Sequence, residues 1–185
     1  MGKPTPLQRA LVGPAGEHYV LFRLYRQGML ASLAPPGFPT VDVLVLAYDQ
    51  SVIASLQVKT RTYGTDKGWH MSIKHESISE PRLFYAFVDL EPELPVTYIV
   101  PSNVVADVLK KSHQAWLATP GAKGQQRNDN PMRRIQPLYP DEFPGYSPDW
   151  LNEWRERWDL LVATRNMRHA DASSPSVSLA TEEVA

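Results

Sequence analysis

The sequence predicts an α/β domain with a mixed central β-sheet and a helical extension after it. A helical pattern near the N-terminus is followed by several β-rich apolar runs and then by a second helical pattern. This order is typical of domains in which helices and a sheet pack in layers. The chain has 185 residues, of which 43% are hydrophobic, and this length is enough to bury a sizeable core in one domain.

We expect one domain over residues 1–165, with its core at about 14–118 and an extension at 119–165. Within the extension, residues 119–148 are rich in Pro, Gly, Asn and Asp and are expected to form a long irregular connection. Residues 166–185 are rich in Ser, Ala and acidic residues. Such a segment buries too little apolar surface to order itself, so a disordered tail is expected.

The first helix is expected from residue 14 to about 27, after a loose polar arm at 1–12. Proline is tolerated at an early helix position, Glu17 complements the N-terminal end of the helix dipole, and Gly28 is a typical stop. Apolar side chains fall near one face of this segment, with Arg and Gln away from it. A short strand at 29–33 follows.

Two apolar, β-rich runs at 41–48 and 52–60 flank the turn-like residues 49–51 and predict a β-hairpin. Hydrophobic patterning and turn residues predict the remaining elements. These are strands at 69–73, 83–90 and 96–100, a helix at about 103–117 capped by Ser102, and a last helix from 147 or 149 to about 163.

The second hairpin strand carries polar and apolar residues in alternation. Side chains alternate across a strand, so Ser55, Gln57 and Lys59 share one face, which is expected to meet water or to carry chemistry. Asp42 opens the neighbouring strand and can reach that polar face. The opposite face is apolar: Ala54, Leu56 and Val58. A solvent-facing hairpin that carries an Asp and a Lys is the ordinary alternative.

This arrangement resembles the PD-(D/E)XK nuclease superfamily, whose signature is an Asp at the start of one hairpin strand and an acid-x-Lys on the next. Asp42 and Gln57-Val58-Lys59 supply the match, with Gln in place of the acid. This variant is similar to the form in Mrr-type restriction enzymes. Glu17 matches the superfamily's Glu on the preceding helix. The resemblance covers roughly residues 14–118 and extends to small bacterial members.

The resemblance implies a restriction-endonuclease-like three-layer sandwich that hydrolyses DNA phosphodiester bonds with Mg²⁺ or Mn²⁺. It implies Glu17, Asp42, Gln57 and Lys59 as catalytic residues, and the side chains of Asp42, Gln57 and Glu17 with the Val58 carbonyl as metal ligands. Hard divalent cations prefer such oxygen ligands. Lys59 would hold or activate the attacking water, or stabilise charge at the scissile phosphate.

Basic residues near this motif are candidates for contacts with the DNA backbone. Arg61 and Lys74 are favoured because they follow the hairpin site in sequence, and such side chains position a polyanion. A solvated surface is the alternative, because 20 acidic residues balance 19 basic ones. Several histidines could contact phosphate or assist a base, although isolated histidines are ordinarily polar surface. They are His18, His70 and His75.

Three tryptophans recur at helical spacing near the C-terminal end: Trp150, Trp154 and Trp158. Such a stripe could stack nucleic-acid bases. A face that packs on the domain core is the favoured interpretation, because aromatic side chains at this spacing bury a large apolar area.

Several classes of protein are disfavoured by what the sequence lacks. There is no cysteine, which excludes thiol catalysis and disulfides and fits a cytoplasmic location. No apolar run approaches the ~20 residues of a membrane span, and the first residues lack a signal-peptide core. There is no P-loop and no Gly-x-Ser-x-Gly elbow. The net charge of −1 argues against a strongly basic coat for nucleic acid.

Two alternatives to an active nuclease stay open. The neutral Gln57 and the near-neutral chain motivate a catalytically weak or inactive nuclease-fold module that binds nucleic acid or a partner protein. A structural protein that dimerises through its tryptophans is the other. Within the nuclease hypothesis, symmetric cleavage of a duplex favours a homodimer. A targeting partner protein also stays open, because no separate recognition domain is evident.

Overall fold

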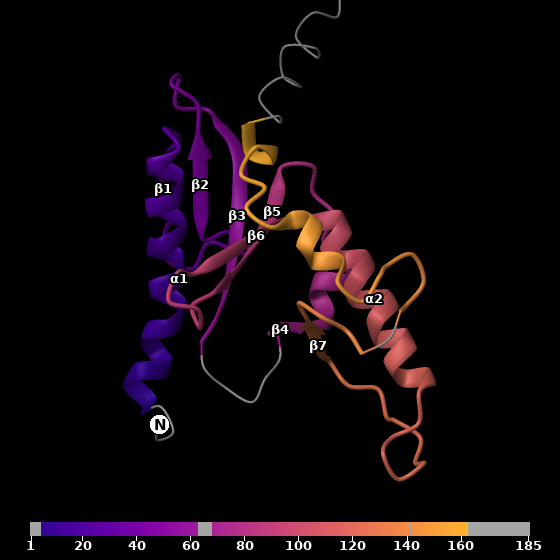
Figure 1. Ribbon diagram of the computed structural model, residues 1–185. Coiled ribbons are helices and arrows are strands. Elements are labelled where there is room, and N and C mark those ends of the chain that lie inside the picture. The colour runs from indigo at the N-terminus through magenta and orange to yellow at the C-terminus, as the bar shows by residue number, and fades with distance from the viewer. Residues whose placement is uncertain (1–4, 63–67, 141, 163–185) are drawn as a thin grey trace, which may run out of the picture.

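The computed structural model describes residues 5–62, 68–140 and 142–162. They form an α/β fold with a mixed five-stranded sheet and a separate two-stranded sheet (Figure 1). The first half comprises α1 (Pro6–Arg26), β1 (Leu30–Leu33), β2 (Val43–Leu46), β3 (Val52–Arg61), β4 (Trp69–Ser72) and the 3₁₀ turn η1 (Ile73–Ser77). The second half comprises β5 (Leu83–Asp89), β6 (Val96–Pro101), α2 (Ser102–Ala118), β7 (Met132–Ile135) and the 3₁₀ turn η2 (Trp150–Trp154).

The larger sheet has the order β1-β2-β3-β5-β6, with β3 in the middle. β3 and β5 run parallel, whereas the other neighbours are antiparallel. The register of the parallel pair sets Gln57 beside Tyr85 and Lys59 beside Phe87. Neighbouring residues in register point to the same side of a sheet. The polar residues of β3 therefore share a face with these two aromatic residues.

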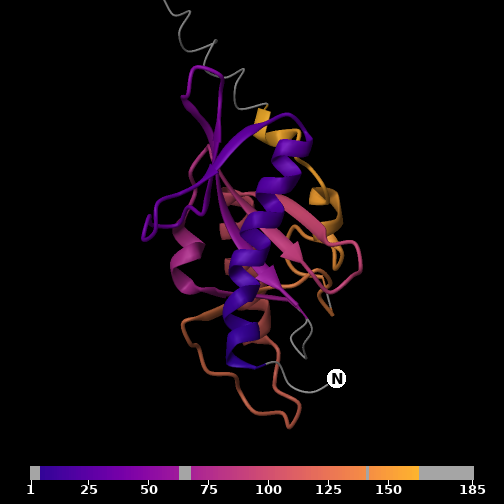
Figure 2. The same cartoon turned by 90° about the vertical axis from the view of Figure 1, so that its left-hand side faces the viewer.

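The two long helices pack on opposite faces of this sheet (Figures 1 and 2). On the α1 face, Val20 and Leu24 pack with Leu56 of β3 in one hydrophobic cluster. On the α2 face, the second cluster contains Val105, Val108, Leu109, Tyr85 and Phe87. Because helices cover both faces of the sheet, the expectation that the polar face of β3 meets water is corrected. Gln57 is only 7% exposed.

The first helix begins at Pro6, so the expectation of a loose arm at 1–12 is wrong where the chain is described. Thr5 and Gln8 explain the early start, because they form a reciprocal capping box. The Thr5 hydroxyl accepts from the Gln8 N–H at 3.2 Å, and the Gln8 side chain accepts from the Thr5 N–H at 2.7 Å. Pro6 occupies the first turn, and Pro14 lies inside the helix rather than at its beginning.

Most of the predicted strands and the second helix are confirmed close to their expected bounds. β2 is shorter than the predicted 41–48, because the chain bends at residue 42 and the turn that leads to β3 begins at residue 48. Ser102 is the first residue of α2 rather than its cap. The predicted irregular connection contains β7, which pairs with β4 in the smaller sheet.

The single helix expected from 147 or 149 to about 163 is wrong in the described residues up to 162, where helical residues begin again only at 160. A 3₁₀ turn at Trp150–Trp154 is followed by Arg155, which forms an isolated β-bridge with Tyr98 of β6. The reason is packing. Trp150 belongs to the hydrophobic cluster on the α2 face and Trp158 to the cluster on the α1 face. The chain must therefore pass around the β6 edge of the sheet, which one straight helix cannot do.

The packing interpretation of the tryptophans is confirmed for Trp150 and Trp158, which are both buried. The tail predicted at 166–185 lies outside the described residues. In the described parts of the chain, no helix combines the length and apolar character needed to cross a bilayer.

Candidate metal and active site

Asp42 is fixed against the central strand just before β2 begins. Its backbone N–H donates to the Leu56 carbonyl at 2.8 Å. Its carboxylate oxygen Oδ2 accepts from the Val58 N–H at 2.7 Å. Both bonds lie on the β2 side of β3, and in a strand the carbonyl of a residue points to the same side as its N–H. The Val58 carbonyl is therefore directed toward the side on which Asp42 lies.

Gln57 lies next to this contact in sequence and brings an amide into a buried setting. Its carbonyl oxygen Oε1 is fully buried and has no hydrogen-bond partner among the described residues. A buried polar oxygen without a partner costs free energy unless a donor or a cation satisfies it. This oxygen is the feature of the site that most clearly calls for a ligand.

Glu17 lies on α1, which covers the face of the sheet opposite to Gln57 and Lys59, and it is within electrostatic range of Asp42. The preceding residue, Gly16, packs so closely on Thr60 of β3 that no side chain fits between helix and strand. Burial raises the pKa of Glu17, the negative charge of Asp42 raises it further, and His18 lowers it. The two carboxylates are thus near enough to repel each other. A cation between them would relieve that repulsion.

Lys59 is the cationic member of the site and is largely withdrawn from water. Burial lowers the pKa of its ammonium group, and repulsion from Lys74 lowers it further, whereas attraction to Asp42 opposes both effects. Lys59 is therefore within electrostatic range of both a negative group and a positive group.

His75 is a buried histidine that the sequence did not distinguish from the others. It lies in η1, and its Nδ1 is 2.7 Å from the hydroxyl of Tyr85. Burial, with the positive charges of Lys59 and Lys74, lowers the pKa of His75 to about 4. The imidazole is therefore neutral at pH 7. Because Tyr85 pairs in register with Gln57, this histidine belongs to the surroundings of the site.

The two candidate DNA-contacting residues differ in their surroundings. Arg61 forms an ion pair with Asp89, and its guanidinium lies 4.8 Å from the centre of the Trp69 ring. Lys74 is exposed in η1 and faces Lys59 closely enough for repulsion. Of the two, Lys74 is the more available to an anion.

The donors around Asp42 suit a hard divalent cation, although few of them are charged. Two carboxylates, an unpartnered buried amide oxygen and a strand carbonyl are all oxygen ligands of the kind that Mg²⁺ and Mn²⁺ accept. In the described ranges, no three His, Asp or Glu side chains gather closely enough to hold a metal ion. A metal here would depend on Gln57 and the backbone in addition to the acids.

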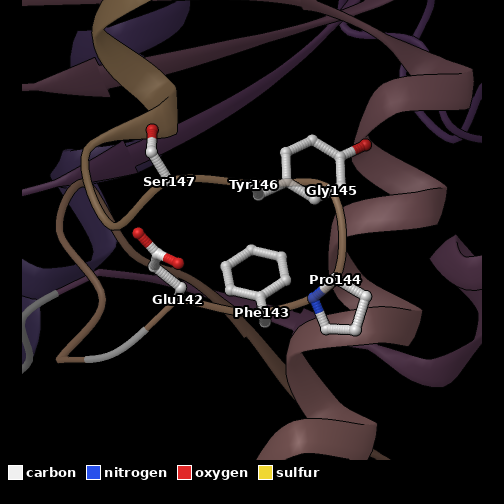
Figure 3. A pocket seen from close by; sticks show the side chains of 6 residues that line it. All are labelled: Glu142, Phe143, Pro144, Gly145, Tyr146 and Ser147. Atoms are coloured by element: carbon white, nitrogen blue, oxygen red, sulfur yellow. The ribbon is translucent and has the colours of Figure 1, made fainter.

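A separate hollow of about 470 Å³ is lined by residues 142–147 alone. Figure 3 shows the Tyr146 hydroxyl pointing toward α2, with Glu142 and Ser147 on the other side of the hollow. That hydroxyl donates to Asp107 at 2.8 Å, and the Tyr146 ring stacks on Phe143. These contacts hold the loop on α2, and none of the hairpin residues lines this hollow.

No protein-family model matches the chain, and no curated protein matches it in sequence. Among solved structures, the bacterial homing endonuclease I-Ssp6803I is similar, with 14% sequence identity and a TM-score of 0.47. The similarity covers 89% of this chain and 97% of that chain. Values of this size do not assign the chain to a family.

Proposed function

We propose that the protein is a metal-dependent nuclease that hydrolyses DNA phosphodiester bonds, built on a restriction-endonuclease-like three-layer sandwich. Asp42, Glu17, the Gln57 amide oxygen and the Val58 carbonyl would hold Mg²⁺ or Mn²⁺. Lys59 would act on the attacking water or the scissile phosphate. Lys74 would contact the DNA backbone, with Arg61 in a lesser part because Asp89 and Trp69 already hold it.

The observation that carries this proposal is the buried, unpartnered Gln57 oxygen beside a carboxylate that is tied to the next residue. A bound cation would satisfy this oxygen, whose burial otherwise costs free energy. The same cation would also offset the repulsion between Glu17 and Asp42. The Gln-x-Lys motif adds a lysine that would stabilise charge at the phosphate or act on the attacking water.

The residues divide the chemistry between them. A divalent cation supplies Lewis-acid polarisation of a phosphate oxygen and a more acidic water when bound. Asp42 is held in place by the Val58 N–H, so it needs little reorganisation to act as a ligand. The lowered pKa of Lys59 brings its amine closer to proton exchange near neutral pH, which suits a group that orients or deprotonates water.

Plasmid nicking tests the proposal directly. Purified protein is incubated with supercoiled plasmid in Mg²⁺, in Mn²⁺ and with chelator, beside Asp42→Ala, Lys59→Ala and the exposed-lysine control Lys110→Ala. We expect metal-dependent nicking that falls about 100-fold or more in the two site variants, the scale seen for loss of one group that stabilises a transition state. The Lys110→Ala control should retain wild-type activity.

Circular dichroism must show that both site variants remain folded. Folded Asp42→Ala and Lys59→Ala proteins that still cut the plasmid at the wild-type rate would remove these residues from the proposed site. Cleavage that persists in chelator would remove the metal.

A module that binds nucleic acid or a partner protein without cutting is the second candidate. The absence of a three-member His, Asp or Glu cluster in the described residues favours it. Calorimetry with Mg²⁺ and Mn²⁺ separates the two candidates. Binding heat that disappears in Asp42→Ala supports the nuclease, and no heat in either protein supports the module.

A further inference from the structure

The small sheet formed by β4 and β7 is a two-stranded antiparallel ribbon set apart from the main sheet (Figure 1). Its register pairs Trp69 with Ile135 and His70 with Arg134. The two strands come from distant parts of the chain. β4 follows the hairpin strand, and β7 lies in the segment after α2.

One face of the ribbon is firmly anchored. Trp69 and Ile135 are buried in the hydrophobic cluster on the α2 face. The Trp69 indole N–H donates to the Val88 carbonyl of β5 at 3.0 Å. Arg133 is 4% exposed and forms an ion pair with Glu76 of η1. The ribbon is therefore held to both the main sheet and η1.

The other face is directed outward and combines basic with apolar side chains. Met132 is 57% exposed and Ile73, at the start of η1, is 47% exposed. The outward positions of the two strands and the first two residues of η1 include no acidic residue. They are His70, Ser72, Ile73, Lys74, Met132 and Arg134. This face therefore carries positive charge beside exposed apolar side chains.

This face leads directly to the candidate active site. The Ile73 N–H donates to the Pro131 carbonyl at 2.9 Å, which extends the pairing of the ribbon into η1. The next residue, Lys74, lies near enough to Lys59 to repel it. A polyanion that spans both lysines would also pass along the ribbon.

We propose that the outward face of the β4–β7 ribbon binds a groove of duplex DNA beside the candidate active site. A two-stranded ribbon fits the major groove. Arg134 brings a positive charge to the phosphates, His70 lies beside it in register, and Met132 offers apolar contact to thymine methyl groups. This inference rests on the proposed function for its choice of DNA. It deepens that function by assigning the part of the chain that recognises the substrate.

Fluorescence anisotropy with a labelled 30-bp duplex in chelator tests binding apart from cleavage. The variants are Arg134→Gln, His70→Gln and Met132→Ser, with Arg26→Gln at the end of α1 as the matched charge control. We expect Arg134→Gln to weaken binding at least about five-fold and to reduce the salt dependence by about one phosphate contact. Arg26→Gln should bind as the wild type does.

Several outcomes would overturn the inference. They are a wild-type protein that does not bind the duplex, three folded ribbon variants with unchanged affinity, or equal weakening by Arg26→Gln. Light scattering adds one more, because a mass that halves in Met132→Ser would make this face a contact between copies of the chain. If Arg134→Gln does not fold, His70→Gln and Met132→Ser decide the matter.

Failure of the inference and failure of the proposed function are distinguishable. Wild-type protein that binds the duplex through the ribbon and never cuts it contradicts the nuclease and leaves the ribbon interface in place. Metal-dependent cutting that is lost in Asp42→Ala and unaffected by the ribbon variants contradicts only the interface.

Discussion

At the scale of single residues, His75 is the side chain with the most unusual environment. It is 3% exposed, contacts the Tyr85 hydroxyl and faces two lysines. Its pKa of about 4 in the folded protein is well below the 6.5 of an ordinary histidine. At a pH between these two values, His75 is protonated in the unfolded chain and neutral in the folded protein. The free energy of unfolding therefore decreases as the pH falls.

We therefore expect the contribution of His75 to stability to be complete above pH 6.5 and to be lost as the pH falls toward 4. The shift corresponds to up to about 3 kcal/mol, at about 1.4 kcal/mol for each pKa unit. Urea unfolding of the wild type and of His75→Asn between pH 7.5 and 4.5 measures it. The difference in unfolding free energy between the two proteins should shrink as the pH falls.

Carboxylates also titrate in this range, and the variant cancels their contribution. His18→Asn is the matched control, because His18 is exposed on α1 and its Nδ1–H donates only within its own helix, to the Pro14 carbonyl at 2.8 Å. The same pH profile for all three proteins would show that His75 is not held neutral by burial.

The candidate site could be predicted in part because its signals are local. Asp42, Gln57 and Lys59 stand in one hairpin, and the two-residue alternation of a strand puts Gln57 and Lys59 on one face. Their burial and the role of His75 could not be predicted, because both depend on the pairing of β3 with β5. Nothing in the sequences of these two segments indicates that they pair with each other.

At the scale of elements, the contact of α1 with β3 sets the position of Glu17. Gly16 is the point of closest approach, since a methyl group there would overlap the Thr60 side chain. Gly13 lies in the same helix, three residues earlier, and a methyl group there would meet nothing within 4 Å. These two glycines form a natural pair for measuring the packing.

We expect Gly16→Ala to destabilise the protein by about 1–3 kcal/mol, the usual cost of overpacking. Gly13→Ala should stabilise it by about 0.5–1 kcal/mol, because alanine is the better helix former. Thermal and urea unfolding measure both changes. Adding Thr60→Ala to Gly16→Ala should recover part of the loss. Equal effects of the two glycine substitutions would mean that the helix does not pack through Gly16.

The spacing of apolar residues was sufficient to predict α2 but not the structure of the tryptophan segment. α2 was predicted because its apolar residues recur at helical spacing and its contacts lie on one side of the molecule. The tryptophan segment has the same spacing, yet its ends are buried on opposite faces of the sheet. Periodicity does not reveal which surface covers each residue, so the second prediction failed.

At the scale of the whole molecule, Glu156 joins the C-terminal segment to the rest of the fold. Its backbone has a φ of 56°, in the left-handed region that non-glycine residues rarely adopt. Its carboxylate accepts from the Thr97 N–H at 2.9 Å and from the Trp158 indole N–H at 2.8 Å. It also forms an ion pair with Arg23 of α1. These contacts offset the strain of the turn.

Glu156→Gln should destabilise the protein by about 1–3 kcal/mol, because hydrogen bonds to a charged group are the stronger kind and one acceptor oxygen becomes a donor. Glu153→Gln, at an exposed position of η2, should change stability by less than about 0.5 kcal/mol. Urea unfolding of both variants tests this. Similar losses of stability in the two variants would show that the carboxylate of Glu156 does not hold the segment 155–158 against β6 and α1.

The passage of residues 155–156 along β6 also determines which sheet edges are open to strand pairing with another copy of the chain. The backbone at Arg155 and Glu156 bonds to the middle of β6 and covers that edge of the sheet. Among the described residues, the other edge is β1, where the Tyr25 hydroxyl donates to the Ala31 carbonyl and no further strand lies alongside. Exposed edges invite another chain to add. If two copies joined there, each would occupy the β1 edge of the other, so growth through the five-stranded sheet would end at a pair rather than a fibril.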